Sequence, residues 1–206
     1  MTKTLSEFLE SIAEQEQYIM TYGHSALSEC NGAMYRVDLL LIGICKRTIA
    51  HCSGFRTMIK QNNFICAASM LRMQLDTALR AFGLGMVDDP EDFAKHLLQG
   101  GRYDTYKDSA GNQLRDRYLV KEVAKQFSWV ESVYKETSDF VHLSERHLFT
   151  AIGSIDEDNQ IVNFDVSAQD PNKGDDQYVE AAHAFRAVTG IILGILSDWR
   201  DQRRDV

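Results

Sequence analysis

Apolar residues recur every three or four positions through most of the chain, and this spacing predicts amphipathic helices rather than strands. Only two prolines, Pro90 and Pro171, interrupt the pattern, so the helices should be long. The expected helices lie at residues 4–22, 34–60, 64–86, 90–99, from about 113 onward with a restart near 128, and 176–203. Five or six such helices predict an all-α fold, an up-and-down helical bundle that forms one domain over residues 1–206.

The segment from Phe64 to Met86 differs from the others because apolar residues cover nearly its whole circumference. A helix of this kind must be surrounded by other helices, so we expect it at the centre of the bundle. Asn63 is a suitable N-cap for this helix, and Pro90 is typical of the first turn of the short helix that follows. Ser128 and Glu131 fit a capping box at the restart of the later helical region.

Two short runs of strand-forming residues occupy residues 147–152 and 161–166, and an acidic turn separates them. This pattern predicts one small β-hairpin inserted near residues 147–166, before the last helix. The last helix carries apolar residues at spacings of three and four over residues 178–199, so one stripe should be buried along most of its length.

The composition, 44% hydrophobic and 25% charged, is that of an ordinary soluble folded protein. A formal net charge of −8 repels nucleic acid, which is therefore not expected as a partner. The start of the chain lacks the charged and apolar regions of a signal peptide. The longest apolar runs also fall short of the roughly 20 residues that cross a bilayer, so we expect a cytoplasmic protein without a membrane partner.

The four cysteines, Cys30, Cys45, Cys52 and Cys66, show no CxxC spacing and lie in apolar or helical surroundings. We expect free, buried thiols. His51 adjoins Cys52, but seven residues of helix separate Cys45 from Cys52 by about 10 Å, which is too far for one zinc ion without a partner segment. No metal site and no cofactor are therefore expected.

Tyr134, Ser138 and His142 recur every four residues, so in a continuous helix they form one polar row at the border of the apolar face. Two interpretations of this row stay open. The side chains can hydrogen-bond across a seam between helices, or they can line a ligand-binding or catalytic site.

Arg72, Asp76 and Arg80 form a second row with the same spacing on the expected central helix. Buried charges must be paired or must face a cleft, whereas exposed ones form an ordinary salt-bridged stripe, and both interpretations stay open. We expect the two rows to face each other, with Asp76 accepting a hydrogen bond from Tyr134 or His142. The candidate ligand-binding residues are therefore Arg72, Asp76, Arg80, Tyr134 and Ser138.

No motif in the chain specifies a reaction. The sequence contains no GxGxxG or GxxxxGK loop, no GxSxG elbow and no HExxH helix. Candidate chemistry must therefore come from the polar rows and from the residues that follow them.

The stretch LRMQLDTALRAFGL, followed by YKETSDFVHLSERH, resembles the pattern of uncharacterised bacterial helical-bundle proteins, some of which are encoded beside phage-defence or abortive-infection genes. In that pattern an Arg-x3-Asp/Glu row and a Tyr-x3-Ser-x3-His row lie on central helices. The matching residues here are Arg72 and Asp76, then Tyr134, Ser138 and His142. The resemblance covers roughly the middle half of the chain with the hairpin and the closing helix, and it implies a fold more than an activity.

The bundle is also similar in outline to HEPN domains, many of which are metal-independent ribonucleases that work as dimers. Their hallmark is an arginine followed, within a short range of spacings, by a histidine. The nearest pairs here are Arg47 with His51, one residue short, and His142 with Arg146 and His147, in the wrong order. Ribonuclease chemistry needs a general base, His142 or His147, and a group that stabilises the phosphorane charge, Arg146, so these three are the candidate catalytic residues.

These observations predict a binding or effector module of unassigned molecular activity, with bacterial defence or stress response as its setting. Two alternatives stay open, a HEPN-like ribonuclease toxin and a purely structural partner protein. The long second and last helices carry apolar stripes that look larger than one small bundle needs, so we expect a symmetric homodimer. A further protein or a small ligand is the other expected partner.

Overall fold

The computed structural model describes residues 3–28, 34–170 and 172–204. Within these residues the elements are α1 (Leu5–Ser28), α2 (Arg36–Lys60), α3 (Phe64–Leu84), α4 (Pro90–Leu98), η1 (Tyr103–Thr105), α5 (Asp116–Ala124), α6 (Val130–Val141), α7 (Glu145–Thr150), β1 (Ile152–Asp156), β2 (Ile161–Phe164) and α8 (Asp175–Arg204). The predicted all-α bundle with one small hairpin is confirmed. The described residues form eight α-helices, more than the five or six expected, because the region after residue 113 is divided twice.

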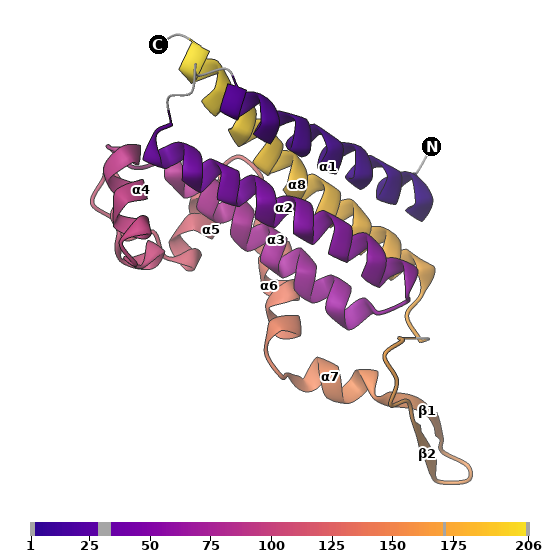
Figure 1. Ribbon diagram of the computed structural model, residues 1–206. Helices are drawn as coiled ribbons and strands as arrows, with labels where there is room; N and C mark the ends of the chain where they lie inside the picture. Colours follow the sequence, from indigo (N-terminus) through magenta and orange to yellow (C-terminus); the bar gives the residue numbers. More distant parts are fainter. Residues whose placement is uncertain (1–2, 29–33, 171, 205–206) are drawn as a thin grey trace.

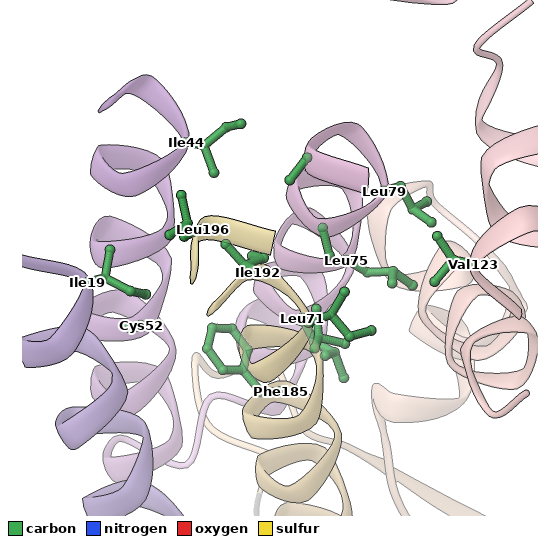
Figure 2. Packing of buried hydrophobic residues seen from close by; sticks show 14 of the residues in the cluster. Ile19, Ile44, Cys52, Leu71, Leu75, Leu79, Val123, Phe185, Ile192 and Leu196 are labelled. Atoms are coloured by element: carbon green, nitrogen blue, oxygen red, sulfur yellow. The ribbon is translucent and has the colours of Figure 1, made fainter. Parts of the chain in front are cut away.

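Four long helices, α1, α2, α3 and α8, form the bundle (Figure 1). Helix α1 lies against α2 and α8, and α3 lies against the same two helices, so the four surround one interior. Phe55 of α2 stacks on Phe185 of α8 with 4.1 Å between ring centroids. Figure 2 shows this core, to which all four helices contribute buried side chains such as Ile19, Leu75 and Ile192. Burial of these apolar groups is the main contribution to the stability of the fold.

Helix α3 also contacts α5 and α6, so four helices surround it and its predicted central position is confirmed. The Asn63 side chain accepts a hydrogen bond from the Cys66 N–H at 3.0 Å, which confirms the predicted N-cap. The Asp170 carboxylate accepts from the N–H groups of Phe64 and Ile65 at 2.7 and 3.2 Å. A carboxylate at this position also interacts favourably with the helix dipole. These hydrogen bonds hold the segment that precedes α8 against the start of α3.

The up-and-down order holds for the first three helices but not for α8. The Tyr178 hydroxyl, near the start of α8, donates to the Asn62 carbonyl at the start of α3. Thr189, further along α8, accepts from Gln74, further along α3. The two helices therefore run in the same direction. Residues 85–174 return the chain from the end of α3 to its beginning, and α4 to α7 with the hairpin make up this return.

The predicted strand at residues 147–152 is wrong. Helix α6 ends at Val141, and Ser144 begins a new helix, α7, by donating its backbone N–H to Nδ1 of His147 at 3.2 Å. This local cap makes residues 147–150 helical despite their strand-forming side chains. Strand β1 begins at Ile152 instead, and its antiparallel partner β2 confirms the second predicted strand.

The predicted capping box of Ser128 and Glu131 is not formed. Helix α6 starts after Trp129, which makes no side-chain cap, and the Val130 N–H donates to the Phe127 carbonyl at 2.9 Å instead. The restart near residue 128 is nevertheless confirmed, because a turn separates α5 from α6 at this point.

The bundle itself covers most of the apolar stripes of α2 and α8. Phe185, Ile192 and Leu196 of α8 are fully buried, and so are Cys52 and Phe55 of α2. The reason given above for a homodimer is therefore wrong, and the homodimer stays a prediction. By length and composition alone, residues 175–201 of α8 could cross a membrane, a property that core helices of soluble proteins share.

Two of the four cysteines are buried as predicted. Burial raises the pKa of Cys45 to about 11 and that of Cys52 to about 12, so both thiols are inert at neutral pH. Cys66 is exposed, contrary to the prediction, because it lies in the first turn of α3, at the end of the bundle. Cys30 lies outside the described residues.

A polar network crosses the otherwise apolar core. Nδ1 of His51 and Oε1 of Gln74 lie 3.0 Å apart, and Nε2 of Gln74 donates to the Thr189 hydroxyl at 3.0 Å. Because the Gln74 oxygen is the acceptor in this arrangement, Nδ1 of His51 carries the proton. Burial lowers the pKa of His51 and outweighs the opposing effect of its hydrogen bond to Gln74. The folded protein therefore holds His51 neutral.

This depressed pKa makes stability depend on pH. Below the ordinary histidine pKa of about 6.5, the unfolded chain binds a proton that the folded chain resists, so the folded protein loses stability as the pH is lowered through that range. We expect the melting temperature to decrease as the pH is lowered from about 8 to about 5. We also expect His51→Gln, which cannot take up this proton, to show a smaller fall. Differential scanning calorimetry of both proteins measures the difference, and an equal fall in the two would exclude His51 as the cause.

Candidate functional site

Arg72, Asp76 and Arg80 follow one another along one face of α3, as their spacing predicted. Their side chains are 13%, 24% and 29% exposed, so the row is mostly buried but reaches solvent. Charges at such positions need partners, because water solvates them only in part.

The partners form a chain of alternating charges. Asp76 lies 3.2 Å from Nε of Arg80 and 3.6 Å from Arg47 of α2. Arg80 also donates to the Asp116 carboxylate at 2.8 Å, and Arg72 lies 3.7 Å from the same carboxylate. Asp116 stands in the first turn of α5, where the helix dipole favours a negative charge. The arginines of α3 are therefore ordered by a helix from the returning segment of the chain.

Two tyrosine rings complete the network. The Arg72 guanidinium lies 4.2 Å from the centre of the Tyr134 ring, and the Arg80 guanidinium lies 4.6 Å from the centre of the Tyr103 ring. Both are cation–π distances. The Tyr103 hydroxyl donates to the Arg80 carbonyl, and burial raises the pKa of this phenol well above its ordinary value.

Gly83 permits the close approach of Tyr103 to α3. A Cβ atom at position 83 would lie 2.6 Å from the Tyr103 hydroxyl oxygen and 3.0 Å from a methyl group of Leu119. Any side chain there would push both residues away from the helix. The glycine is therefore needed for Tyr103 to reach Arg80.

The two predicted rows meet at one point, the contact between Arg72 and Tyr134. The predicted hydrogen bond from Tyr134 or His142 to Asp76 is wrong, since Asp76 is held by arginines. Ser138 turns back to its own helix and donates to the Tyr134 carbonyl at 2.6 Å. His142 does not extend the row, because α6 ends at Val141 and leaves His142 exposed in extended backbone.

The other candidate catalytic residues have structural partners. Nε of Arg146 lies 3.4 Å from the Asp139 carboxylate, and the Arg146 guanidinium lies 5.6 Å from the centre of the Phe140 ring. Nδ1 of His147 is engaged by the Ser144 N–H that begins α7. Arg146 and His147 thus both lie beside Phe140, whereas His142 is exposed between α6 and α7.

A cavity of about 400 Å³ adjoins the charge network between α2, α3 and α4. Its apolar wall consists of Leu39, Leu40, Gly43, Ile44, Ala94, Leu97 and Leu98. Its polar end consists of Arg47, Asp76, Thr77, Arg80 and Tyr103. An apolar cavity of this size with polar groups gathered at one end is typical of a small-molecule site.

The polar end has an excess of positive charge. The network contains three arginines, Arg47, Arg72 and Arg80, but only two carboxylates, Asp76 and Asp116. Arg47 is the least committed of the three. Its Nε donates to the Thr77 hydroxyl at 2.9 Å, its 3.6 Å contact with Asp76 is too long for a hydrogen bond, and its side chain is 49% exposed.

Three residues of this site were not among the candidates from the sequence. Arg47 lies on α2, Tyr103 in η1 and Asp116 at the start of α5, so their proximity to α3 depends on the packing of helices. Only Asp116 carries a local signal, since acidic residues favour the first turn of a helix. Among the described residues, no group of three or more His, Cys, Asp or Glu side chains is arranged to hold a metal ion.

No protein-family model, curated protein or solved structure matches this chain. The HEPN-like relationship and the resemblance to bacterial bundle proteins therefore stay predictions. The geometry of the site is the basis for any statement about function.

The charge network should contribute more to stability than an exposed ion pair does. Asp76→Ala leaves Arg47 and Arg80 close together without a shared carboxylate, so we expect a loss of about 1–3 kcal/mol in unfolding free energy. Asp139→Ala is the matched control, because it breaks an aspartate–arginine pair whose side chains are about half exposed, and it should cost less than about 1 kcal/mol. Urea unfolding of the two variants decides the matter, and equal losses would contradict this expectation.

Proposed function

We propose that this protein is a binding module for a small amphipathic anion, held in the cavity between α2, α3 and α4. The observation that carries this proposal is an apolar cavity of about 400 Å³ that ends at a network with more arginines than carboxylates. The apolar wall favours a hydrocarbon or aromatic body. The excess arginine favours a carboxylate or phosphate head group.

Arg47 is the residue that contacts the head group in this proposal. Arg80 is held by both Asp76 and Asp116, so its role is to neutralise Asp76 and keep it from repelling an anion. Nε of Arg47 is hydrogen-bonded to Thr77, but its terminal nitrogen makes only the weak 3.6 Å contact with Asp76, so the exposed end of the guanidinium can turn toward a ligand. Leu97 and Leu98 of α4 belong to the apolar part of the lining, where they would contact the apolar body.

Other expectations from the sequence remain alternatives to this function. A ribonuclease role for His142, Arg146 and His147 has less support, because Arg146 and His147 already have structural partners. A purely structural role does not account for the cavity or for the excess of arginine at its polar end. A setting in bacterial defence or stress response and a cytoplasmic location are compatible with ligand binding but do not follow from it.

Isothermal titration calorimetry with octanoate, an amphipathic carboxylate, tests the proposal. We expect saturable binding of octanoate and weaker binding of octanol, which has the same chain length without the charge. Arg47→Gln should weaken octanoate binding by about 10-fold to 100-fold, which corresponds to one hydrogen bond to a charged group. Equal affinity of the two proteins for octanoate would contradict a role for Arg47.

A glycine substitution tests whether octanoate binds in this cavity rather than elsewhere on the surface. Gly43 lines the cavity, and a Cβ atom there meets nothing within 4 Å, so the helix accepts a side chain at this position and Gly43→Leu places one at the cavity. Gly23 of α1 is the matched control, since it is also helical and open but lies away from the cavity. Both substitutions should raise helix stability slightly. Loss of octanoate binding in Gly43→Leu and not in Gly23→Leu is expected, and unchanged binding in Gly43→Leu would exclude this cavity.

A further inference from the structure

Exposed apolar side chains are concentrated in one part of the molecule. Nine of the 16 large hydrophobic residues exposed in the described part of the chain lie between residues 141 and 166. This stretch, the arm, contains the end of α6, helix α7 and the hairpin, and it projects from one end of the bundle (Figure 1). Concentrated apolar exposure of this kind marks a surface that another molecule covers.

Strand β2 is the least protected element of the arm. Its four residues, Ile161 to Phe164, are exposed on both faces, and none of them is charged. It pairs with β1 on one edge, in a sheet of only two strands. A two-stranded sheet is marginally stable in water, and an uncharged edge strand without proline invites pairing with another strand.

The edge of β1 is less available than that of β2. The Gly153 carbonyl of β1 accepts a hydrogen bond from the Asn172 side chain at 3.2 Å, and Asp156 adds a charge at the end of the strand. A further strand would therefore add to β2.

We propose that β2 pairs with β2 of a second copy of this chain, antiparallel about a twofold axis, to give a four-stranded sheet in the order β1-β2-β2-β1. An uncharged strand is complementary to itself in this arrangement, as a twofold interface requires. The pairing would give β2 hydrogen bonds on both edges. With the axis at Val162, this residue faces Val162 of the other copy, and Phe164 of each copy lies diagonal to that residue.

The distribution of charge selects the antiparallel orientation and a second copy as the occupant. The hairpin turn carries Asp156, Glu157 and Asp158. At the base of the hairpin, a cavity of about 300 Å³ is lined by Arg146, Lys173 and one carboxylate, Asp170, which already accepts the N–H groups that begin α3, so the charge of this lining is net positive. Antiparallel pairing puts the two acidic turns at opposite ends of the sheet, each toward the net positive cavity of the other copy. Parallel pairing would bring the acidic turns together, which repulsion disfavours.

Size-exclusion chromatography with light scattering measures the outcome on the full chain. We expect twice the chain mass of 23.4 kDa at micromolar concentration. Val162→Lys and Val162→Glu should each be monomeric, because like charges then face each other across the axis. An equimolar mixture of these two variants should form the dimer again, because lysine of one copy then faces glutamate of the other.

Two further variants keep the test decisive. Tyr18→Lys changes an exposed apolar residue of α1, far from the arm in the sequence, and should remain dimeric. A chain in which a glycine–serine turn replaces residues 153–164 should be monomeric with the helical circular dichroism of the parent. A monomeric parent, a dimer that survives both Val162 substitutions, or a mixture that stays monomeric would each overturn the proposal.

Discussion

The rest of the structure depends on the burial of helix α3 by the helices around it. This helix has apolar side chains around most of its circumference, and a helix of that kind is stable only where other elements exclude water on all sides. Helices α2 and α8 cover part of it, and α5 and α6 cover more. The chain reaches α5 and α6 only after leaving the bundle, so the long return between α3 and α8 is a consequence of the composition of α3. The parallel direction of α3 and α8 follows in turn, since the return ends where α3 begins.

The charged row on α3 determines how the segment between α3 and α8 packs against α3. Arg72 and Arg80 need a carboxylate, and Asp116 provides it from α5, while Tyr103 and Tyr134 lie over the two guanidinium groups. Gly83 provides the space for Tyr103. These contacts order the polar end of the cavity beside α2 and α4. The same row therefore stabilises the fold and supplies the charges of the proposed binding site.

The arm differs from the bundle in its physical chemistry. Inside the bundle, apolar residues are buried and polar ones such as His51 and Gln74 find hydrogen-bond partners. In the arm, Leu143, Phe149 and Phe164 are exposed, and the hairpin has too few strands to bury its own side chains. The pairing of hairpins between two copies would supply the missing strands without any change to the bundle. It also leaves the cavity between α2, α3 and α4 open, because the two sites lie on different elements.

The sequence alone determined the helical class, the central place of α3, the cap at Asn63 and the hairpin before the last helix. These features depend on apolar periodicity and on hydrogen bonds between residues close in the chain, which are readable in any sequence. The prediction from sequence was wrong where two local signals compete. At Ser144 a helix cap outweighs the strand-forming side chains of residues 147–150, and the break before this cap leaves His142 outside the polar row. Only the tertiary structure decided that Asp76 meets Arg47 and that Asp116 and Tyr103 join the row on α3. Contacts between distant segments depend on how helices pack and in which direction they run, and the periodicity of a single helix carries no information about either.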